Sequence, residues 1–202
     1  MTADKSPGFF LNALGQQWEV YQFTLTNWGI SREYALELIV PNADIPSLLN
    51  QAAHLTFDDH LFHGFITAHH SAHSDQHQIS NIRLVSPLTY YLSHHHTRIY
   101  KSESLTCIIR QVLKEAGLQE GIDFALKMNS EKKQWWFNEV NEPGLVFLNR
   151  VLAANKLYYA YEQTNDQAQC VLTDSLSALL PDDSLSLQLT SKTGFTRQYG
   201  IP

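Results

Sequence analysis

The histidines of this chain are its most obvious candidates for metal binding or acid–base catalysis. All ten fall between His54 and His96, and they include the pair His69-His70 and the run His94-His95-His96. Imidazole is a common ligand of transition metals, but a site needs several converging ligands and neighbouring groups that orient them. The stretch from His69 to His77 also contains Ser and Asp and is typical of a solvated hairpin loop. The pattern therefore favours solvated histidines over a metal centre.

Nucleophilic catalysis requires a nucleophile, a base and an orienting acid, and the sequence offers no recognisable set of the three. His63, in the segment Phe62-His63-Gly64, has no G-x-S-x-G elbow or suitable cysteine to act on. Cys107 lies beside an apolar helical stripe, so we expect a packed thiol, and Cys170 has no partner at C-x-x-C spacing. No glycine-rich nucleotide-binding motif occurs. The sequence therefore predicts a protein that is not an enzyme, with no catalytic, cofactor-binding or metal-binding residues.

The aromatic run Trp135-Trp136-Phe137 could form a platform for a ligand or a contact with another subunit. In a strand, Trp135 and Phe137 would share one face and Trp136 the other. One face must point away from the local core, so we expect core packing combined with a subunit contact. An enzyme of another class, metal-dependent through the histidines or ligand-binding through the tryptophans, stays open as an alternative.

Composition and charge exclude several classes of function. The net charge is −6 and the 14 basic residues are scattered, whereas nucleic-acid binding needs clustered Lys and Arg. Residues 1–8 lack the basic and apolar regions of a signal peptide, and no apolar run approaches the about 20 residues of a membrane helix. The two isolated cysteines fit a reducing compartment. We therefore expect a cytoplasmic protein that binds no nucleic acid and does not insert into a membrane.

The first third of the sequence predicts antiparallel strands. Residues 18–26 are rich in aromatic and β-branched side chains, and Asn27-Trp28-Gly29 supplies a turn. Residues 33–40 alternate, with one predicted face formed by Tyr34, Leu36, Leu38 and Val40, and the other by Glu33, Ala35, Glu37 and Ile39. These patterns indicate a strand that is buried on one face.

The next segments add a short helix and three more strands. Asp44 is a suitable N-cap for a short helix that carries Ile45, Leu48 and Leu49. Residues 53–57 and 61–68 predict a hairpin around Asp58-Asp59, and residues 78–86 predict the following strand. Closely spaced strands with short turns favour a barrel or a strongly curved sheet.

From Ser102 onward the apolar period becomes helical. One stripe, at the i, i+3, i+4 spacing, is formed by Leu105, Ile108, Ile109, Val112, Leu113 and Ala116. Ser102 can cap its start, and Gly117 stands where a left-handed residue would let Leu118 contact Leu113.

A second helix is predicted to open at Glu142-Pro143-Gly144 and to stop near Asn155. Its predicted buried face consists of Leu145, Leu148, Val151 and Leu152. Residues 157–162 and 169–173 then predict a hairpin over the loop at residues 165–167, and loosely held strands are expected from Leu176 onward.

The order of these elements resembles one family, over roughly residues 10–175. The resemblance rests on an ordered set of segments, which are Phe62-His63-Gly64, Leu84 to Pro87, Arg98-Ile99-Tyr100, Ile108-Ile109 with Val112-Leu113, Trp135-Trp136-Phe137, and Glu142 to Phe147. Together they resemble the N-terminal hub module of the type VI secretion spike proteins (VgrG) and the related baseplate hubs of contractile phage tails. No single motif is specific, but their order and spacing are.

The resemblance implies an α+β fold, a curved antiparallel β-barrel of the phage tail hub type with an inserted two-helix segment. The expected parts are residues 1–87 for the first barrel strands, 88–155 for the inserted segment, and 156–202 for returning strands and a truncated tail. The structural motif positions are Phe62, His63, Gly64, Pro87, Arg98 and Glu142. The candidate subunit contacts are Trp135, Trp136 and Phe137.

The function implied is assembly rather than catalysis. The chain would be a structural subunit of a spike or baseplate hub. We expect it to form a homotrimer on the end of a stacked-ring tube, with tube rings, baseplate components and effector cargo as partners. It would be delivered outside the cell with the spike. A hub of a contractile phage or tailocin is the alternative.

The sequence departs from the family pattern in two places. It has Pro143-Gly144 where relatives carry a small polar residue and an acid, and Lys156 where relatives carry glycine. We expect Asn155 to take the left-handed turn in place of that glycine. Because full spike proteins continue into a neck and a needle, we also expect this chain to be an excised fragment or a short relative.

Overall fold

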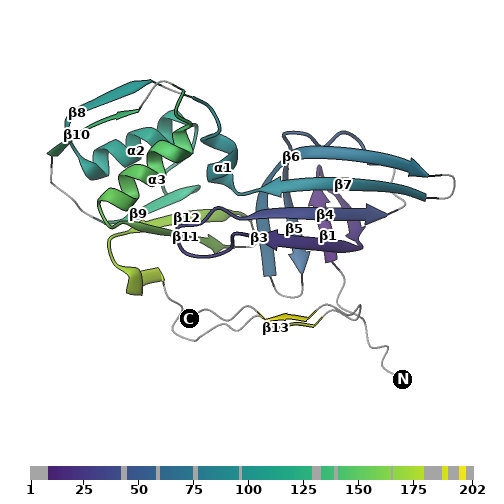
Figure 1. The fold of residues 1–202 in the computed structure, drawn as a ribbon. Coiled ribbons are helices and arrows are strands. Elements are labelled where there is room, and N and C mark those ends of the chain that lie inside the picture. The colour runs from purple at the N-terminus through teal and green to yellow at the C-terminus, as the bar shows by residue number, and fades with distance from the viewer. Residues whose placement is uncertain are drawn as a thin grey trace.

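The computed structural model describes residues 9–41, 45–57, 60–74, 77–95, 97–128, 133–138, 141–164, 166–179, 188–190 and 196–198. Figure 1 shows two lobes side by side, one made of long strands and one that mixes helices with short strands. Each lobe has its own cluster of buried apolar side chains. Each lobe is therefore stabilised by its own core, and the contacts that join the two lobes are separate from these cores.

The first lobe is a seven-stranded sheet in the order β2-β1-β5-β6-β7-β4-β3, and every neighbouring pair is antiparallel. Its strands are β1 (Phe9–Ala13), β2 (Gln16–Val20), β3 (Gln22–Thr26), β4 (Ala35–Pro41), β5 (Ala52–Phe57), β6 (His60–Ser74) and β7 (His77–Val85). The two edge strands, β2 and β3, are consecutive in the chain and separated only by Tyr21. The sheet must therefore curl until its edges meet, which confirms the predicted curved antiparallel sheet.

Alternation along the strands explains the core of this half-barrel. Leu36, Leu38 and Val40 of β4 are buried, while Glu37 between them is exposed, as the pattern predicts. Gly64 lies in the middle of β6, where a Cβ atom would overlap the carbonyl oxygen of Val85 and lie 2.8 Å from Leu84 Cδ2. Only glycine allows β6 and β7 to approach so closely.

Three local predictions in this lobe are corrected. Residues 18–26 form two strands instead of one, because the chain bends at Tyr21 to connect opposite edges of the sheet.

Residues 45–50 form no helix. The backbone at the end of this segment forms hydrogen bonds with β6 instead. Asn50 N donates to Ile66 O at 2.7 Å, and Ile66 N donates to Gln51 O at 3.0 Å. Ile45 and Leu48 are still buried, and Asp44 and Asp58-Asp59 lie outside the described residues.

The third correction concerns the histidine-rich segment. It is not a loop, because β6 continues to Ser74 and β7 begins at His77, with His69 opposite Ile82 and His73 opposite Gln78. The pairing of β7 with β4 reaches as far as Ile79 opposite Pro41. Pairing with β4 thus stabilises the extended backbone of this segment. The amino-acid composition of the segment does not by itself indicate a strand.

The second lobe follows β7. It contains α1 (Pro87–Tyr91), β8 (Arg98–Ser104), α2 (Leu105–Glu115), β9 (Phe124–Lys127), β10 (Lys133–Asn138), α3 (Gly144–Ala154), β11 (Tyr158–Gln163), β12 (Ala168–Thr173) and the short 3-10 helix η1 (Leu176–Leu179). Strands β11, β12 and β9 form one small sheet and β10 and β8 another, while β13 (Gln188–Thr190) pairs with β14 (Thr196–Gln198). The predicted hairpin of residues 157–162 and 169–173 is confirmed as β11 and β12. The division of the chain at residues 87 and 155 stays a proposal.

Helix α2 agrees with its predicted stripe. Leu105, Ile108, Ile109, Val112 and Leu113 are buried. Its cap is Ser104 rather than Ser102, because residues 98–104 continue strand β8, and Ser104 Oγ accepts from Cys107 N at 3.3 Å. Gly117 has φ +101°, and Leu118 N donates to Leu113 O at 3.1 Å, so the predicted left-handed ending is confirmed.

Helix α3 begins after Pro143 and ends at Asn155, as predicted. Its buried face includes Phe147 and only partly Leu145. Asn155 has φ −110°, whereas Lys156 has φ +56°, so the expected left-handed asparagine is wrong. The side chain of Asn155 instead donates to Val151 O at 2.8 Å, which fixes Asn155 in the last turn and leaves the left-handed position to Lys156.

Candidate functional site at the junction of the two lobes

The two lobes meet where three chain segments converge. These are the loop before β4, the link between β7 and α1, and strand β11. Ser31 N donates to Tyr159 O at 2.7 Å, and Ser86 N donates to Tyr34 O at 3.1 Å. Because these bonds connect backbone to backbone, all three segments are fixed at the same place.

Glu33 is the central polar group of this junction. Its Oε2 atom accepts hydrogen bonds from Tyr161 Oη at 2.6 Å, from Thr89 Oγ1 at 3.3 Å and from Ser86 Oγ. Ser86 is fully buried and also caps α1, since its Oγ accepts from Thr89 N at 3.4 Å. One carboxylate oxygen of the barrel lobe thus collects donors from α1, its cap and β11.

Two buried polar atoms lie unpaired in the same junction. Among the described residues, Glu33 Oε1 and Tyr159 Oη have no hydrogen-bond partner. Burial first, and then the charge of Glu33, raises the pKa of the Tyr159 and Tyr161 phenols well above the ordinary value. Both phenols therefore stay protonated, and that of Tyr161 acts as a donor toward the carboxylate.

A second polar set connects β6 with the end of β11. Tyr34 Oη donates to the carbonyl oxygen of His63, and Gln163 Nε2 donates to Tyr34 Oη at 3.3 Å. The His63 ring, through Nε2, lies 2.9 Å from Thr164 O and therefore carries its proton on that nitrogen. Burial is the main reason that the pKa of His63 is lowered. In these contacts His63 connects the two lobes.

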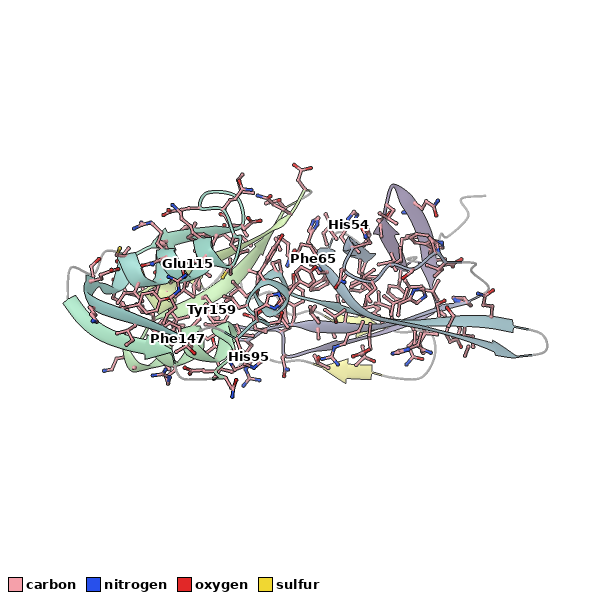
Figure 2. All side chains as sticks on the ribbon, turned by 90° about the horizontal axis from the view of Figure 1, so that it is seen from above. His54, Phe65, His95, Glu115, Phe147 and Tyr159 are labelled. Atoms are coloured by element: carbon pink, nitrogen blue, oxygen red, sulfur yellow. The ribbon has the colours of Figure 1, made fainter. Side chains whose placement is uncertain are left out.

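An aromatic cluster borders the junction on the barrel side. Phe65 of β6 stacks on Tyr90 of α1, with 4.2 Å between ring centroids and an angle of 7° between ring planes. Figure 2 shows Phe65 and His54 on the barrel, and Tyr159 and Phe147 within the second lobe. Phe62, from the same predicted motif as His63, is buried and meets Trp28 edge-on at 5.1 Å. Apolar contacts therefore surround the polar network.

The other predicted motif positions form local structural contacts. Pro87 is the buried first residue of α1. Arg98 Nη1 lies 3.1 Å from Glu115 Oε1, which ties β8 to α2. Glu142 binds Arg150 through two parallel contacts.

The aromatic run lies on β10, whose backbone pairs with β8. Trp136 is opposite Tyr100 and Phe137 is opposite Ile99, with an irregularity between Gln134 and Trp136. The side chains of β10 lie outside the described residues. On the neighbouring elements Ile99 is 63% exposed and Val146 of α3 is 52% exposed. A subunit contact through Trp135, Trp136 and Phe137 stays a proposal, and these two exposed apolar residues extend the candidate surface.

The histidines are distributed along strands and loops. The rings of His54 and His63 are 5.0 Å apart, and His69 Nε2 lies 3.3 Å from both Ser80 Oγ and Ser71 Oγ. His94 and His95 are exposed, and His94 O accepts from Gly144 N at 3.0 Å. Within the part of the chain that the structure describes, no group of three or more His, Cys, Asp or Glu side chains could hold a metal ion.

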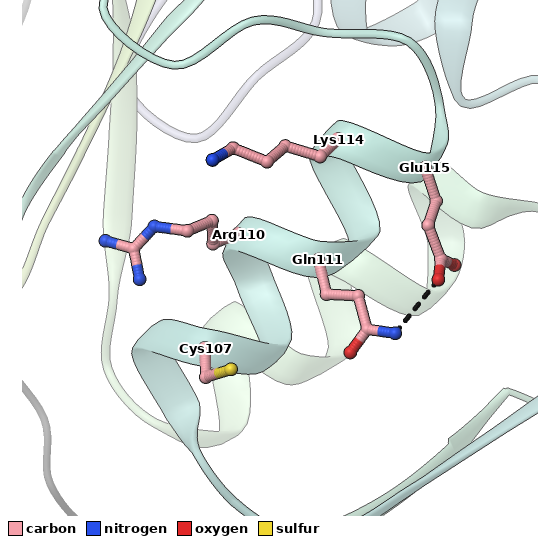
Figure 3. Close-up of a pocket in the computed structure, with 5 residues that line it drawn as sticks. All are labelled: Cys107, Arg110, Gln111, Lys114 and Glu115. Atoms are coloured by element: carbon pink, nitrogen blue, oxygen red, sulfur yellow. Dashed lines mark hydrogen bonds between the residues drawn. The ribbon is translucent and has the colours of Figure 1, made fainter.

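Cys107 is exposed, so the predicted packed thiol is wrong for this residue, whereas Cys170 is buried. Cys107 follows Leu105 by two positions, about 200° around the helix, and therefore points away from the stripe. Figure 3 shows it in a shallow depression on the outer side of α2 with Arg110, Gln111, Lys114 and Glu115. Burial, followed by Glu103, raises the pKa of the Cys107 thiol. A raised pKa leaves less of the nucleophilic thiolate form.

The role of Glu33 at the junction was not predicted from the sequence, in which Glu33 is only one position of an alternating pattern. The available signal was the alternation of Tyr159 and Tyr161, which places two phenols on one strand face and calls for an acceptor opposite them.

The described helices include none that is long and apolar enough to cross a membrane.

The comparisons with known proteins agree with this architecture. A family model described as phage tail baseplate hub (GPD) matches residues 29–199. Comparison with curated proteins gave no significant match.

Several solved structures share the fold. The E. coli c3393 protein, described as a type VI secretion component with structural similarity to the T4 tail proteins gp27 and gp5, is 17% identical with a TM-score of 0.73, over 83% of this chain and 49% of that chain. The 43 kDa tail protein of Shewanella oneidensis prophage MuSo2 is 16% identical with a TM-score of 0.59, over 83% and 55%.

A chain of the Francisella PdpA–VgrG complex is 15% identical with a TM-score of 0.65, over 92% of this chain and 32% of that chain. The present chain thus spans between about a third and about half of these relatives. The likeness confirms the predicted fold class, a curled antiparallel half-barrel with a few helices of the tail hub type.

Proposed function

Because the chain belongs to the phage tail baseplate hub (GPD) family, we propose that it is a structural subunit of a type VI secretion spike or baseplate hub. The observation that carries this proposal is the extent of the family match, which covers residues 29–199 and therefore most of both lobes. The shared fold with a secretion component, at a TM-score of 0.73, supports the secretion reading. A hub of a contractile phage or tailocin is the alternative, supported by the likeness to a prophage tail protein.

We further propose that the subunit assembles as a homotrimer on the end of a stacked-ring tube, with baseplate components and effector cargo as further partners. The candidate contact surface includes β10 together with Ile99 and Val146, whose exposed apolar side chains would lose contact with water on assembly. The solved PdpA–VgrG complex, in which a related fold binds another protein, supports partners of this kind.

The proposed role needs no catalytic centre. Three of the polar side chains considered for chemistry have structural partners in the described part of the chain, namely His63 in Thr164, His69 in Ser80, and Glu142 in Arg150. The subunit would be made in the cytoplasm and leave the cell only as part of the assembled spike.

Deletion of the coding sequence in the source bacterium tests the role and separates the two readings. For a secretion spike, deletion abolishes release of the tube protein into the medium, and the wild-type gene restores it. For a phage or tailocin hub, deletion abolishes intact tail particles after induction. Normal tube release together with normal particles in the deletion strain would contradict both.

A further inference from the structure

The orientation of the two lobes is not set by a shared apolar core. The buried cluster of the barrel lobe and that of the second lobe have no residue in common. Tyr34 and Tyr161 touch edge to face across the junction, with centroids 5.0 Å apart. Apolar contact is non-directional, so the angle between the lobes depends on directional hydrogen bonds. Two of these join backbone to backbone, from Ser31 N to Tyr159 O and from Ser86 N to Tyr34 O, and the side-chain bonds of Glu33 lie beside them.

We propose that the carboxylate of Glu33 is a latch that holds the two lobes in a single orientation. This inference does not rest on the proposed hub function. It assigns Glu33 as a positioning residue and Ser86, Thr89 and Tyr161 as the groups that the latch engages.

The geometry supports a latch because the donors come from separate elements. Tyr161 lies in β11, Thr89 in α1, and Ser86 at the cap of α1, yet all three hydroxyls bond to one oxygen of Glu33. Hydrogen bonds to an ionised acceptor are short, directional and stronger than neutral ones. Rotation of the second lobe against the barrel would lengthen several of them at once.

The network contributes orientation more than stability. Among the ion pairs of the described residues, none gives Glu33 a basic partner, and its Oε1 atom and the hydroxyl of Tyr159 are buried without hydrogen bonds. Glu33 is half-buried, and a shielded carboxylate oxygen without a cation or hydrogen bond lowers stability, whereas apolar side chains of similar volume would bury the same surface at lower cost. Apolar side chains, however, would not select one orientation of the two lobes, because their contacts are not directional.

The second polar set and Glu33 connect different elements. The side chains of Tyr34 and Gln163 attach β11 to the backbone of His63 in β6, while the backbone oxygen of Tyr34 accepts from Ser86 N at the cap of α1. On the side of α1, Phe65 of β6 stacks on Tyr90 without any hydrogen bond between the two side chains. Glu33 therefore links the barrel to α1 and β11 together.

The test measures the distance between the lobes in the full chain. The exposed native Cys107 of α2 and a cysteine introduced at Tyr21, which is 69% exposed on the barrel, carry spin labels, while Cys170 is buried and escapes labelling. Pulsed electron resonance gives the distance distribution for the parent protein, Glu33→Ala and Tyr161→Phe. The matched control is Glu37→Gln, which removes an exposed carboxylate from β4.

We expect one narrow distance peak for the parent and for Glu37→Gln. Glu33→Ala should lose the narrow peak and give a broad distribution, with Tyr161→Phe in between, while circular dichroism shows both lobes folded. An unchanged narrow peak in Glu33→Ala and Tyr161→Phe would overturn the proposal. Unfolding of either lobe in Glu33→Ala would also overturn it, because a latch acts between cores that fold independently of it.

Discussion

Glu142 and Arg150 form a two-pronged ion pair along the start of helix α3. Arg150 Nε lies 3.0 Å from Glu142 Oε1, and Arg150 Nη2 lies 2.8 Å from Glu142 Oε2. Pro143 provides no side-chain cap for this helix. The Arg150 guanidinium also lies 5.4 Å from the centre of the Phe147 ring. The pair thus fixes the helix start at the place where a polar cap is missing.

Glu142→Gln should lower the free energy of unfolding by about 1–2 kcal/mol, because it removes the charge from a two-pronged bond. The Glu142 side chain is only 11% exposed. Glu162→Gln, in the exposed pair with Lys127, is the control and should cost about 0.5 kcal/mol or less. Urea denaturation measures both, and equal effects would show that the Glu142 pair contributes no more than a surface pair.

Lys156→Gly should stabilise the protein by about 0.5–1 kcal/mol, because glycine adopts the left-handed backbone of this position without strain. Leu157 N donates to Leu152 O at 3.0 Å, so the turn itself is already formed. Asn155→Gly should instead destabilise, since it removes the side-chain bond to Val151 O. Thermal melts of both variants would contradict the assignment if Asn155→Gly were the stabilising change.

Ile109→Asp should destabilise the fold by several kcal/mol, because it places an unpaired charge at a fully buried position of helix α2. His95→Ala, at an exposed position, should be nearly neutral. Thermal melts of the two variants decide the matter. Similar losses in both would mean that His95 has a structural role which its exposure does not suggest.

Stability should fall as the pH drops below 6.5. Burial lowers the pKa of His63, His54 and His69 in the folded protein below their ordinary value of 6.5. The unfolded chain therefore binds more protons in the window between the lowered pKa and 6.5, so stability is complete above that window and declines through it. Urea denaturation across this range should show a smaller decline in His63→Gln, and an unchanged decline would exclude His63 as a contributor.

Local signals made much of the second lobe predictable. The stripe of α2, its left-handed end at Gly117, and the limits of α3 all depend on residues close together in the chain. The junction depends on distant ones, since Glu33 and Tyr161 are 128 positions apart. No periodicity reports such a contact.

Each wrong prediction has its own physical origin. The segment from His69 onward has a loop-like composition, but pairing of β7 with β4 keeps its backbone extended. Cys107 lies beside the apolar stripe in sequence, yet the rotation of the helix turns it to solvent. Lys156 takes a backbone conformation that favours glycine because the side chain of Asn155 is used elsewhere.

The most direct test of the hub proposal is cryo-electron microscopy of contractile particles or spikes purified from the source bacterium. We predict density for the curled half-barrel and its second lobe in three copies at the end of the tube, with β10 and Ile99 at contacts between subunits. Particles whose tube end contains no density for this fold, in a strain shown to produce the protein, would contradict the proposal.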